Sequence, residues 1–190
     1  KNLVILFLVA MSTMIYAQNN SIGPTVGYNH SWVSFDNIEA KPGFNVGVVY
    51  NNSFMEHWGA GAEVKFSSEG FKNKLNEGTG ILNYIRVPLR LQYFFGNYGQ
   101  AFRPKIFAGP SIAFLISSKS KIGDQKIDTK GINSIDIGAL GGVGFNYRIA
   151  KVTWLNFDLA YTHGLLDIYT SSAEAKNRNI NVNLGVAFGF

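Results

Sequence analysis

Hydrophobic residues alternate one by one with small or polar residues along much of this chain. In residues 179–190 the even positions hold Ile, Val, Leu and Phe, whereas the odd positions hold Asn, Gly and Ala. Side chains two residues apart lie on the same face of a β-strand, so a period of two gives one apolar face and one small or polar face. The segment is therefore predicted to be a strand with a single hydrophobic side.

The same alternation recurs in seven earlier segments. The predicted strands are residues 22–32, 44–50, 58–66, 84–95, 106–116, 135–148, 155–162 and 179–190. Several of them reach roughly 10 to 12 residues, about the length needed to cross the hydrocarbon core of a bilayer at a tilt. Pro24 and Pro110 fall inside two of the segments, and prolines within strands indicate bulges or local strand ends.

The composition of the two faces distinguishes a membrane barrel from a soluble one. Charged residues share the non-apolar face with Gly and Asn, as the narrow interior of a transmembrane barrel requires, whereas a soluble barrel has its apolar side chains inside. Aromatic residues such as Trp32, Trp58 and Tyr161 stand near segment ends, as expected for interfacial girdles. The sequence therefore predicts an all-β fold, an eight-stranded antiparallel transmembrane up-and-down β-barrel.

The predicted connections differ in length. Three are short (51–57, 96–103 and 149–151), three are long (67–80, 117–132 and 164–178), and the first (35–42) is intermediate. Short turns at one end and long loops at the other are typical of a barrel in the bacterial outer membrane. This pattern predicts that both mature termini lie in the periplasm.

The first 17 residues are typical of a secretory signal peptide. A basic residue precedes an apolar run at residues 3–11, and Ala17 provides a small residue for cleavage. The alternative, a retained helical anchor, needs about 20 apolar residues, roughly twice the length of this run. We expect cleavage after Ala17, which leaves residues 18–190 as one outer-membrane barrel domain.

Composition narrows the possible functions. The chain has no cysteine, which excludes disulfides, thiolate metal sites and lipid attachment through cysteine. The net charge is +5, but the basic residues are scattered among acids instead of forming a run. No nucleic-acid partner is therefore expected.

Seven ionisable residues fall on faces predicted to line the lumen. They are Glu63, Lys65, Arg86, Arg90, Asp136, Arg148 and Asp158. The interior of an eight-stranded barrel is just wide enough for side chains to fill, and an unpaired charge there is costly. We therefore expect a mixed-sign charge network that fills the lumen; the alternative is a selective conduit lined by the same residues.

No residue set indicates a catalytic, cofactor-binding or metal site. His30, His57 and His163 stand on different segments without metal-site spacing. A rim set of His163, Asp167 and Ser171 is conceivable, but no Gly-x-Ser-x-Gly motif accompanies it, and ordinary loop polarity explains these residues. The glycine cluster at residues 138–144 lies within a predicted strand without a following helix, so it indicates close packing and not a dinucleotide loop.

Four motifs resemble the PorT-like outer-membrane β-barrel proteins of Bacteroidetes. In family order they are Tyr-Ile-Arg-Val-Pro-Leu-Arg-Leu-Gln-Tyr-Phe-Phe-Gly at 84–96, Ile-Phe-Ala-Gly-Pro-Ser at 106–111, Asp-Ile-Gly-Ala-Leu-Gly-Gly-Val-Gly-Phe at 136–145 and Gly-Val-Ala-Phe-Gly-Phe at 185–190. The resemblance spans the mature chain and implies the fold and an outer-membrane location. Members of that family range from a component needed for type IX secretion to barrels without an assigned role, and the resemblance implies no catalytic residue.

The observations favour a structural or interaction barrel that displays its loops or docks with an envelope machine such as a secretion apparatus. A narrow pore for small solutes and a rim-site lipid-modifying enzyme are the alternatives. Expected partners are outer-membrane lipids, the barrel-assembly machinery during insertion and an envelope protein, without a cofactor. Connection 117–132 holds Lys119, Lys121, Lys126 and Lys130 against Asp124 and Asp128; it is either a solvated loop or a contact for lipopolysaccharide phosphates.

Overall fold

The computed structural model describes residues 20–75, 78–123, 125–129, 131–170 and 175–190. The signal peptide expected over residues 1–17 and its cleavage after Ala17 lie outside these residues, as do Asp124, Lys130 and Ser171. No helix in the described part of the chain is long and apolar enough to cross a membrane.

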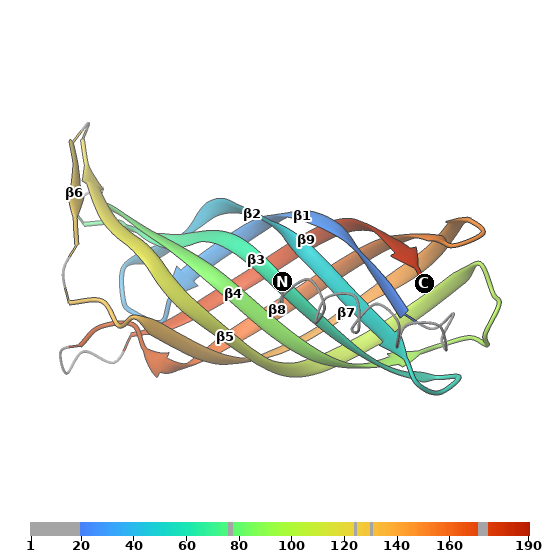
Figure 1. Ribbon diagram of the computed structural model, residues 1–190. Coiled ribbons are helices and arrows are strands. Elements are labelled where there is room, and N and C mark those ends of the chain that lie inside the picture. Colours follow the sequence, from blue (N-terminus) through green and yellow to red (C-terminus); the bar gives the residue numbers. More distant parts are fainter. Residues whose placement is uncertain (1–19, 76–77, 124, 130, 171–174) are drawn as a thin grey trace, which may run out of the picture.

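The described residues form nine strands, eight of which build a closed barrel (Figure 1). The strands are β1 (Asn20–Val33), β2 (Ile38–Ser53), β3 (Trp58–Asn73), β4 (Thr79–Phe94), β5 (Phe102–Ile122), β6 (Gln125–Asp128), β7 (Ile135–Ala150), β8 (Thr153–Asp167) and β9 (Lys176–Gly189). Neighbours pair antiparallel around the barrel, and the pairing of β1 with β9 closes it. β6 pairs with β5 alone, while β7 takes the next place in the wall. The predicted eight-stranded antiparallel barrel is confirmed.

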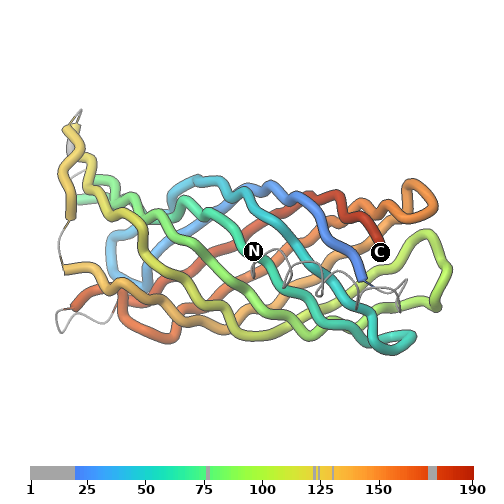
Figure 2. The backbone as a smooth tube through the Cα atoms, in the orientation of Figure 1, coloured from blue at the N-terminus to red at the C-terminus, as the bar shows by residue number. Residues whose placement is uncertain are grey.

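The two ends of the barrel differ (Figures 1 and 2). We call one the terminal end, because Asn20 and Phe190 meet there through a backbone hydrogen bond of 3.0 Å. Its connections are residues 54–57, 95–101 and 151–152. The opposite end, called the hairpin end, carries the β5–β6 hairpin, which stands out from the wall (Figure 1).

The strands extend further than the apolar alternation predicted. Residues 67–73 continue β3 and pair with β4, so the long connection expected over residues 67–80 is mostly strand. The expected connections 117–132 and 164–178 likewise contain paired residues of β5, β8 and β9. The backbone ladder forms whatever the side chains are, whereas apolar alternation ends where the outer face leaves the hydrocarbon region.

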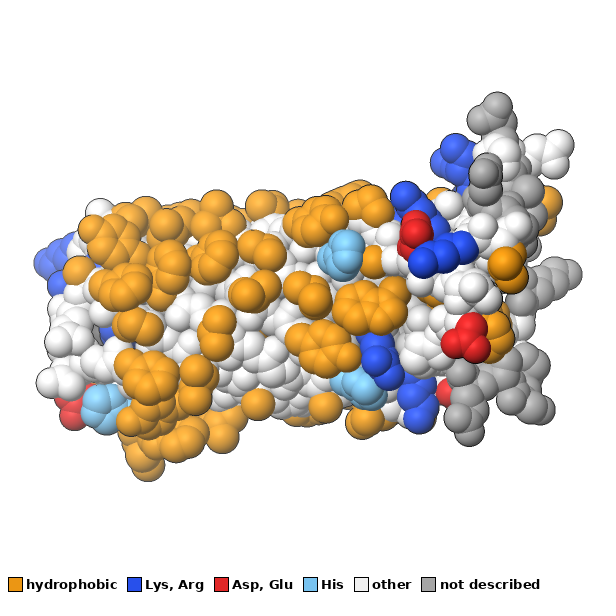
Figure 3. Space-filling model, turned by 180° about the vertical axis from the view of Figure 1, so that it is seen from behind, with side chains coloured by type: hydrophobic (Ala, Val, Ile, Leu, Met, Phe, Trp, Pro, Cys, Tyr) orange, Lys and Arg blue, Asp and Glu red, His pale blue; other side chains and the backbone are white. Residues whose placement is uncertain are grey.

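The wall of the barrel is apolar outside and polar inside. In β9, Leu184 is 49% exposed and points outward, while the neighbouring Asn183 is 4% exposed and points inward. Figure 3 shows hydrophobic side chains over the length of the wall, with most charged side chains gathered near the two ends. This surface suits a bilayer with water at both ends.

Aromatic side chains lie near both ends of the apolar wall. Toward the terminal end, the ring of Tyr93 lies 5.2 Å from the rings of Trp58 and Phe95. Toward the hairpin end, the rings of Trp32 and Tyr161 are 6.3 Å apart. These positions match the two interfacial girdles of an outer-membrane barrel.

Glycines on the inner face leave room for the large side chains that fill the lumen. A Cβ atom added at Gly144 of β7 would lie 2.3 Å from Oδ1 of Asp158, and one added at Gly61 of β3 would lie 2.3 Å from Nε2 of Gln92. The glycine cluster at residues 138–144 lies within β7. The missing side chains leave space there for bulky neighbours.

Candidate functional site

Arg86 of β4 organises a first group of buried charges, here called the Arg86 cluster. Its Nε and Nη2 donate to Oε1 and Oε2 of Glu69, each at 2.8 Å, and Nη2 also donates to Oδ2 of Asp136 at 3.0 Å. Asn177 donates to Oε2 of Glu69 at 2.7 Å, and Ser111 accepts from Nη1 of Arg86 at 3.1 Å. The guanidinium is thus held by side chains from three other strands, β3, β5 and β7, and Asn177 of β9 in turn holds Glu69.

A second group, the Arg90 cluster, follows toward the terminal end. Nη1 of Arg90 lies 2.9 Å from Oε1 of Glu63 and 2.9 Å from Oδ2 of Asp158. Nζ of Lys65 lies 2.9 Å from Oε2 of Glu63, and Nζ of Lys105 lies 2.8 Å from Oδ1 of Asp158. Each of these five side chains is at most 5% exposed.

The two clusters balance their charges within the lumen. Four cationic side chains meet four carboxylates, and each contacts at least one group of opposite sign. The hollow between the clusters is lined by Lys65, Arg86 and Arg90, among others, and has a volume of about 10 Å³. That space holds about one water molecule, so side chains fill this level of the barrel.

An apolar cluster fills the lumen at the hairpin end. Val33, Leu82 and Tyr84 from the strands are each at most 2% exposed and pack with Ile168 and Ala175 of the β8–β9 connection. Backbone bonds hold this connection in place, because the amide of Ile168 donates to the carbonyl of Ala175 and its carbonyl accepts from the amide of Asn133, each at 2.8 Å. The described part of the connection therefore folds over the barrel end.

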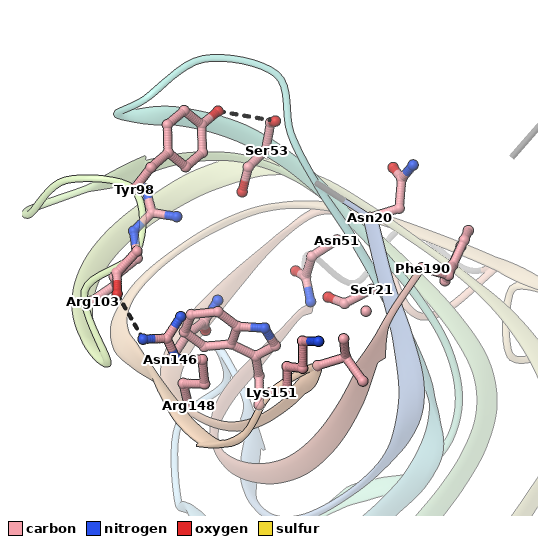
Figure 4. A pocket seen from close by; sticks show the side chains of 14 residues that line it. Asn20, Ser21, Asn51, Ser53, Tyr98, Arg103, Asn146, Arg148, Lys151 and Phe190 are labelled. Atoms are coloured by element: carbon pink, nitrogen blue, oxygen red, sulfur yellow. Dashed lines mark hydrogen bonds between the residues drawn. The ribbon is translucent and has the colours of Figure 1, made fainter. Parts of the chain in front are cut away.

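The terminal end is open, in contrast to the hairpin end. A mouth with a volume of about 430 Å³ lies there, between Asn20 and Phe190 on one side and Tyr98 and Arg103 on the other (Figure 4). Arg148 also lines it. The lumen is thus open at the terminal end and is filled by the paired charges further inside.

The structure brings together six of the seven charges expected in the lumen. Glu63, Lys65, Arg90 and Asp158 share the Arg90 cluster, and Arg86 and Asp136 share the Arg86 cluster. Arg148 is the exception and corrects the expectation. Its Nη2 donates to the carbonyl of Gly99 at 2.8 Å, and its Cζ lies 5.7 Å from the centroid of the Trp154 ring. The inner face of β7 extends past the charge clusters, so Arg148 reaches only the mouth.

Two members of the clusters were missed by the sequence analysis. Glu69 fell in the connection expected over residues 67–80, and Lys105 fell just before the segment 106–116. Both are in phase with known inward positions, since Glu69 follows Glu63 and Lys65 at even spacing in β3. Extending the alternation of inward and outward positions beyond the apolar residues of each strand would have identified both.

The histidines lie on the barrel wall and its turns. Nδ1 of His163 is 3.1 Å from the hydroxyl of Tyr161, and no bond joins His163 to Asp167 within the described residues. Nδ1 of His57 is 3.0 Å from the carbonyl of Phe94, and the ring of His30 lies between those of Tyr28 and Trp32. Among the residues described, no three His, Asp or Glu side chains are grouped so that they could hold a metal ion.

The β5–β6 hairpin presents three of the expected lysines to solvent. Lys119, Lys121 and Lys126 are exposed. Lys119 stands opposite Asp128 and Lys121 opposite Lys126. The hairpin thus carries a net positive charge at the far end of the molecule from the mouth.

Solved structures of several outer-membrane barrels have the same fold. Neisserial surface protein A is similar with a TM-score of 0.59 and 15% identity over 90% of this chain and 97% of that one. OprG of Pseudomonas aeruginosa has a TM-score of 0.60 and 14% identity over 90% and 95%. Ail of Yersinia pestis has a TM-score of 0.51 and 17% identity over 90% and 99%.

The sequence comparisons point to the same class. No curated protein sequence matches the chain significantly. The family described as outer membrane protein beta-barrel domain matches residues 16–170. Together with a closed eight-stranded barrel, an apolar outer wall and a polar lumen, this match places the protein in the bacterial outer membrane. The chain belongs to the family of outer membrane proteins with a β-barrel domain.

Proposed function

We propose that this protein is a non-conducting outer-membrane barrel that displays its hairpin end outside the cell and serves there as a docking or structural element. The observation that carries the proposal is the closed lumen. Paired charges fill its middle, and the cluster around Tyr84 and Ile168 fills its hairpin end. A solute that entered the mouth would have to displace buried ion pairs, at a cost of several kcal/mol per ion.

Permeability separates this function from a narrow pore, the alternative for the same lumen. Liposomes that contain the purified barrel should swell in small sugars no faster than liposomes without protein. A variant in which Arg90 and Asp158 are both replaced by Ala tests whether the paired charges block the lumen. It removes the ion pair of 2.9 Å at the centre of the Arg90 cluster. Rapid swelling with the unmodified protein would refute the proposal and support the pore.

The proposed orientation has both mature termini in the periplasm. Its support is the contrast between the compact turns of the terminal end and the projecting β5–β6 hairpin, because outer-membrane barrels have short periplasmic turns and longer extracellular loops. The chain has no native cysteine, so single cysteines can report on each end. Lys126→Cys should react with a membrane-impermeant maleimide on intact cells, whereas Asn97→Cys should react only after the cells are permeabilised. The reverse labelling would overturn the orientation.

The docking surface in this proposal is the β5–β6 hairpin. Its exposed lysines and the exposed Ile127 offer charge and apolar area to an envelope protein or to lipopolysaccharide phosphates. A variant that replaces residues 119–128 by a two-residue turn should insert normally and lose its partner in cross-linking on intact cells. Lys74→Met, which removes one lysine at the same end but outside the hairpin, is the matched control and should keep that partner.

We further propose that the chain belongs to the PorT-like group within the family. The support is the order of its four motifs, which fall in β4, β5, β7 and β9 of the barrel. A secretion-linked role predicts that deletion of the protein lowers the amount of type IX cargo at the cell surface. Unchanged cargo levels would leave the docking role without a link to secretion and so refute the secretion-linked role.

A further inference from the structure

The mouth at the terminal end is a built pocket lined by cations. Arg103, Arg148 and Lys151 all line it, and no aspartate or glutamate side chain does (Figure 4). Within the described residues, none of the three cations forms an ion pair. The Arg90 cluster below it differs, because every cation there already has a carboxylate partner.

Arg103 is fixed in this pocket with hydrogen-bonding capacity left over. The side chain is only 6% exposed, and its Cζ lies 4.3 Å from the centroid of the Phe94 ring and 5.2 Å from that of Tyr98. Nη2 donates to the carbonyl of Glu56. Nε has no hydrogen-bond partner among the described residues, and neither has Nδ2 of Asn51, a second buried donor in the lining. Buried donors without a partner are costly unless an acceptor satisfies them.

The pocket wall is held in place before any ligand binds. The hydroxyl of Tyr98 donates to the carbonyl of Ser53 at 3.2 Å and ties the β4–β5 turn across the mouth to β2. On the other side, Nη2 of Arg148 donates to the carbonyl of Gly99, and its backbone amide donates to the carbonyl of Ala101 at 2.7 Å. Because both tethers hold the same turn, binding at the mouth would order few additional groups.

We propose that the mouth binds a small oxyanion, the phosphate or carboxylate group of an organic molecule that also has an apolar part. Guanidinium groups recognise both oxyanions through paired hydrogen bonds. Positive charges gathered in a concave site strengthen the local field. The rings of Trp154 and Phe190 in the lining provide contact for an apolar part, and a volume of about 430 Å³ accommodates a small organic molecule.

Titration of the purified barrel in detergent micelles tests the site, in a variant with Trp32 and Trp58 replaced by Phe so that the fluorescence reports Trp154. The probes are inorganic phosphate, phenyl phosphate and benzoate, at constant ionic strength set with sodium chloride. We expect saturable binding, with phenyl phosphate or benzoate at least threefold tighter than inorganic phosphate. Phenyl phosphate tighter than benzoate would identify phosphate as the preferred group, and the reverse order would identify carboxylate.

Variants distinguish this pocket from general attraction to a basic protein. Arg148→Met combined with Lys151→Met should weaken binding at least tenfold, and Arg103→Lys should weaken it while the β-rich circular dichroism spectrum stays unchanged. Lys74→Met removes an exposed cation at the far end, outside the β5–β6 hairpin, and should leave the affinity within twofold. No saturable binding of any probe, or an equal loss in the Lys74 variant, would overturn the proposal. Because the titration uses the isolated barrel, its outcome is independent of the closed lumen and of the orientation.

Discussion

Removal of Arg86 is the sharpest test of the paired lumen. The Arg86→Met variant keeps a long side chain but takes the cation away from Glu69, which is fully buried, and from Asp136, which is 5% exposed. Three charge-assisted hydrogen bonds of 2.8 to 3.0 Å disappear together. Loss of one partner from a buried ion pair costs about 3–5 kcal/mol, because the remaining charge stays buried without compensation. We expect the free energy of unfolding to fall by about this amount.

Equilibrium urea unfolding in lipid vesicles, followed by far-ultraviolet circular dichroism, measures this change. Lys74→Met is the control at the same end of the barrel. Its Nζ lies 3.6 Å from Oε1 of Glu39, but the two side chains are 53% and 58% exposed. Exposed ion pairs contribute about 0–1 kcal/mol, so this variant should unfold close to the unmodified protein.

A neutralised variant shows whether the unpaired charge causes the loss. Arg86→Met combined with Glu69→Gln and Asp136→Asn removes the cation and both carboxylates while the volume changes little. It should recover more than half of the stability lost in the single variant. If Arg86→Met costs no more than Lys74→Met, or if the neutralised variant is no more stable than the single one, the lumen is not held by these ion pairs.

Three further predictions follow from the wall of the barrel. Leu184→Arg should destabilise the protein by about 2–4 kcal/mol in the same unfolding assay, since its side chain faces the bilayer near mid-strand. Leu75→Arg in the β3–β4 connection should have little effect, and equal effects of the two changes would contradict the assigned faces. Gly144→Val should cost about 1–3 kcal/mol by overpacking against Asp158, and its unfolding midpoint should fall; an unchanged midpoint would mean that β7 can move away. Deletion of residues 185–190 should remove the paired residues of β9 nearest the terminal end and leave an open edge in lipid. The amount of this variant in the outer membrane, measured by fractionation, should therefore drop sharply. A normal amount would refute the need for barrel closure.

The sequence predicted the wall of the barrel well, because alternation and exposure have the same cause there. Leu184 faces outward and Asn183 inward, as the pattern in residues 179–190 required. A strand in contact with lipid on one side must alternate, so its pattern specifies its faces. The wall could therefore be read without knowledge of any partner strand.

The closure of the lumen could not be predicted in the same way. Ile168 and Ala175 lie in a connection without alternation, and their burial depends on the fold of that connection over Tyr84. The pairing of Arg86 with Asp136 joins residues 50 positions apart in the chain. Alternation along a strand indicates which face a residue lies on, but not which residue it pairs with. The mouth has the same origin, because Arg103 of β5 and Asn20 of β1 line one pocket only after the sheet curls into a barrel.

The division of the buried charges between the two halves of the barrel bears on how it assembles. β3 and β4 supply three cations and two carboxylates of the clusters, whereas β5, β7 and β8 supply one cation and two carboxylates. The halves therefore carry opposite net charges on the faces that meet when the sheet curls shut. A slip of one residue in any of these strands would turn its charges outward, into lipid, where they are costly. A sheet that closes with one of these strands shifted by one residue would place buried charges in lipid, so the paired lumen disfavours that misalignment.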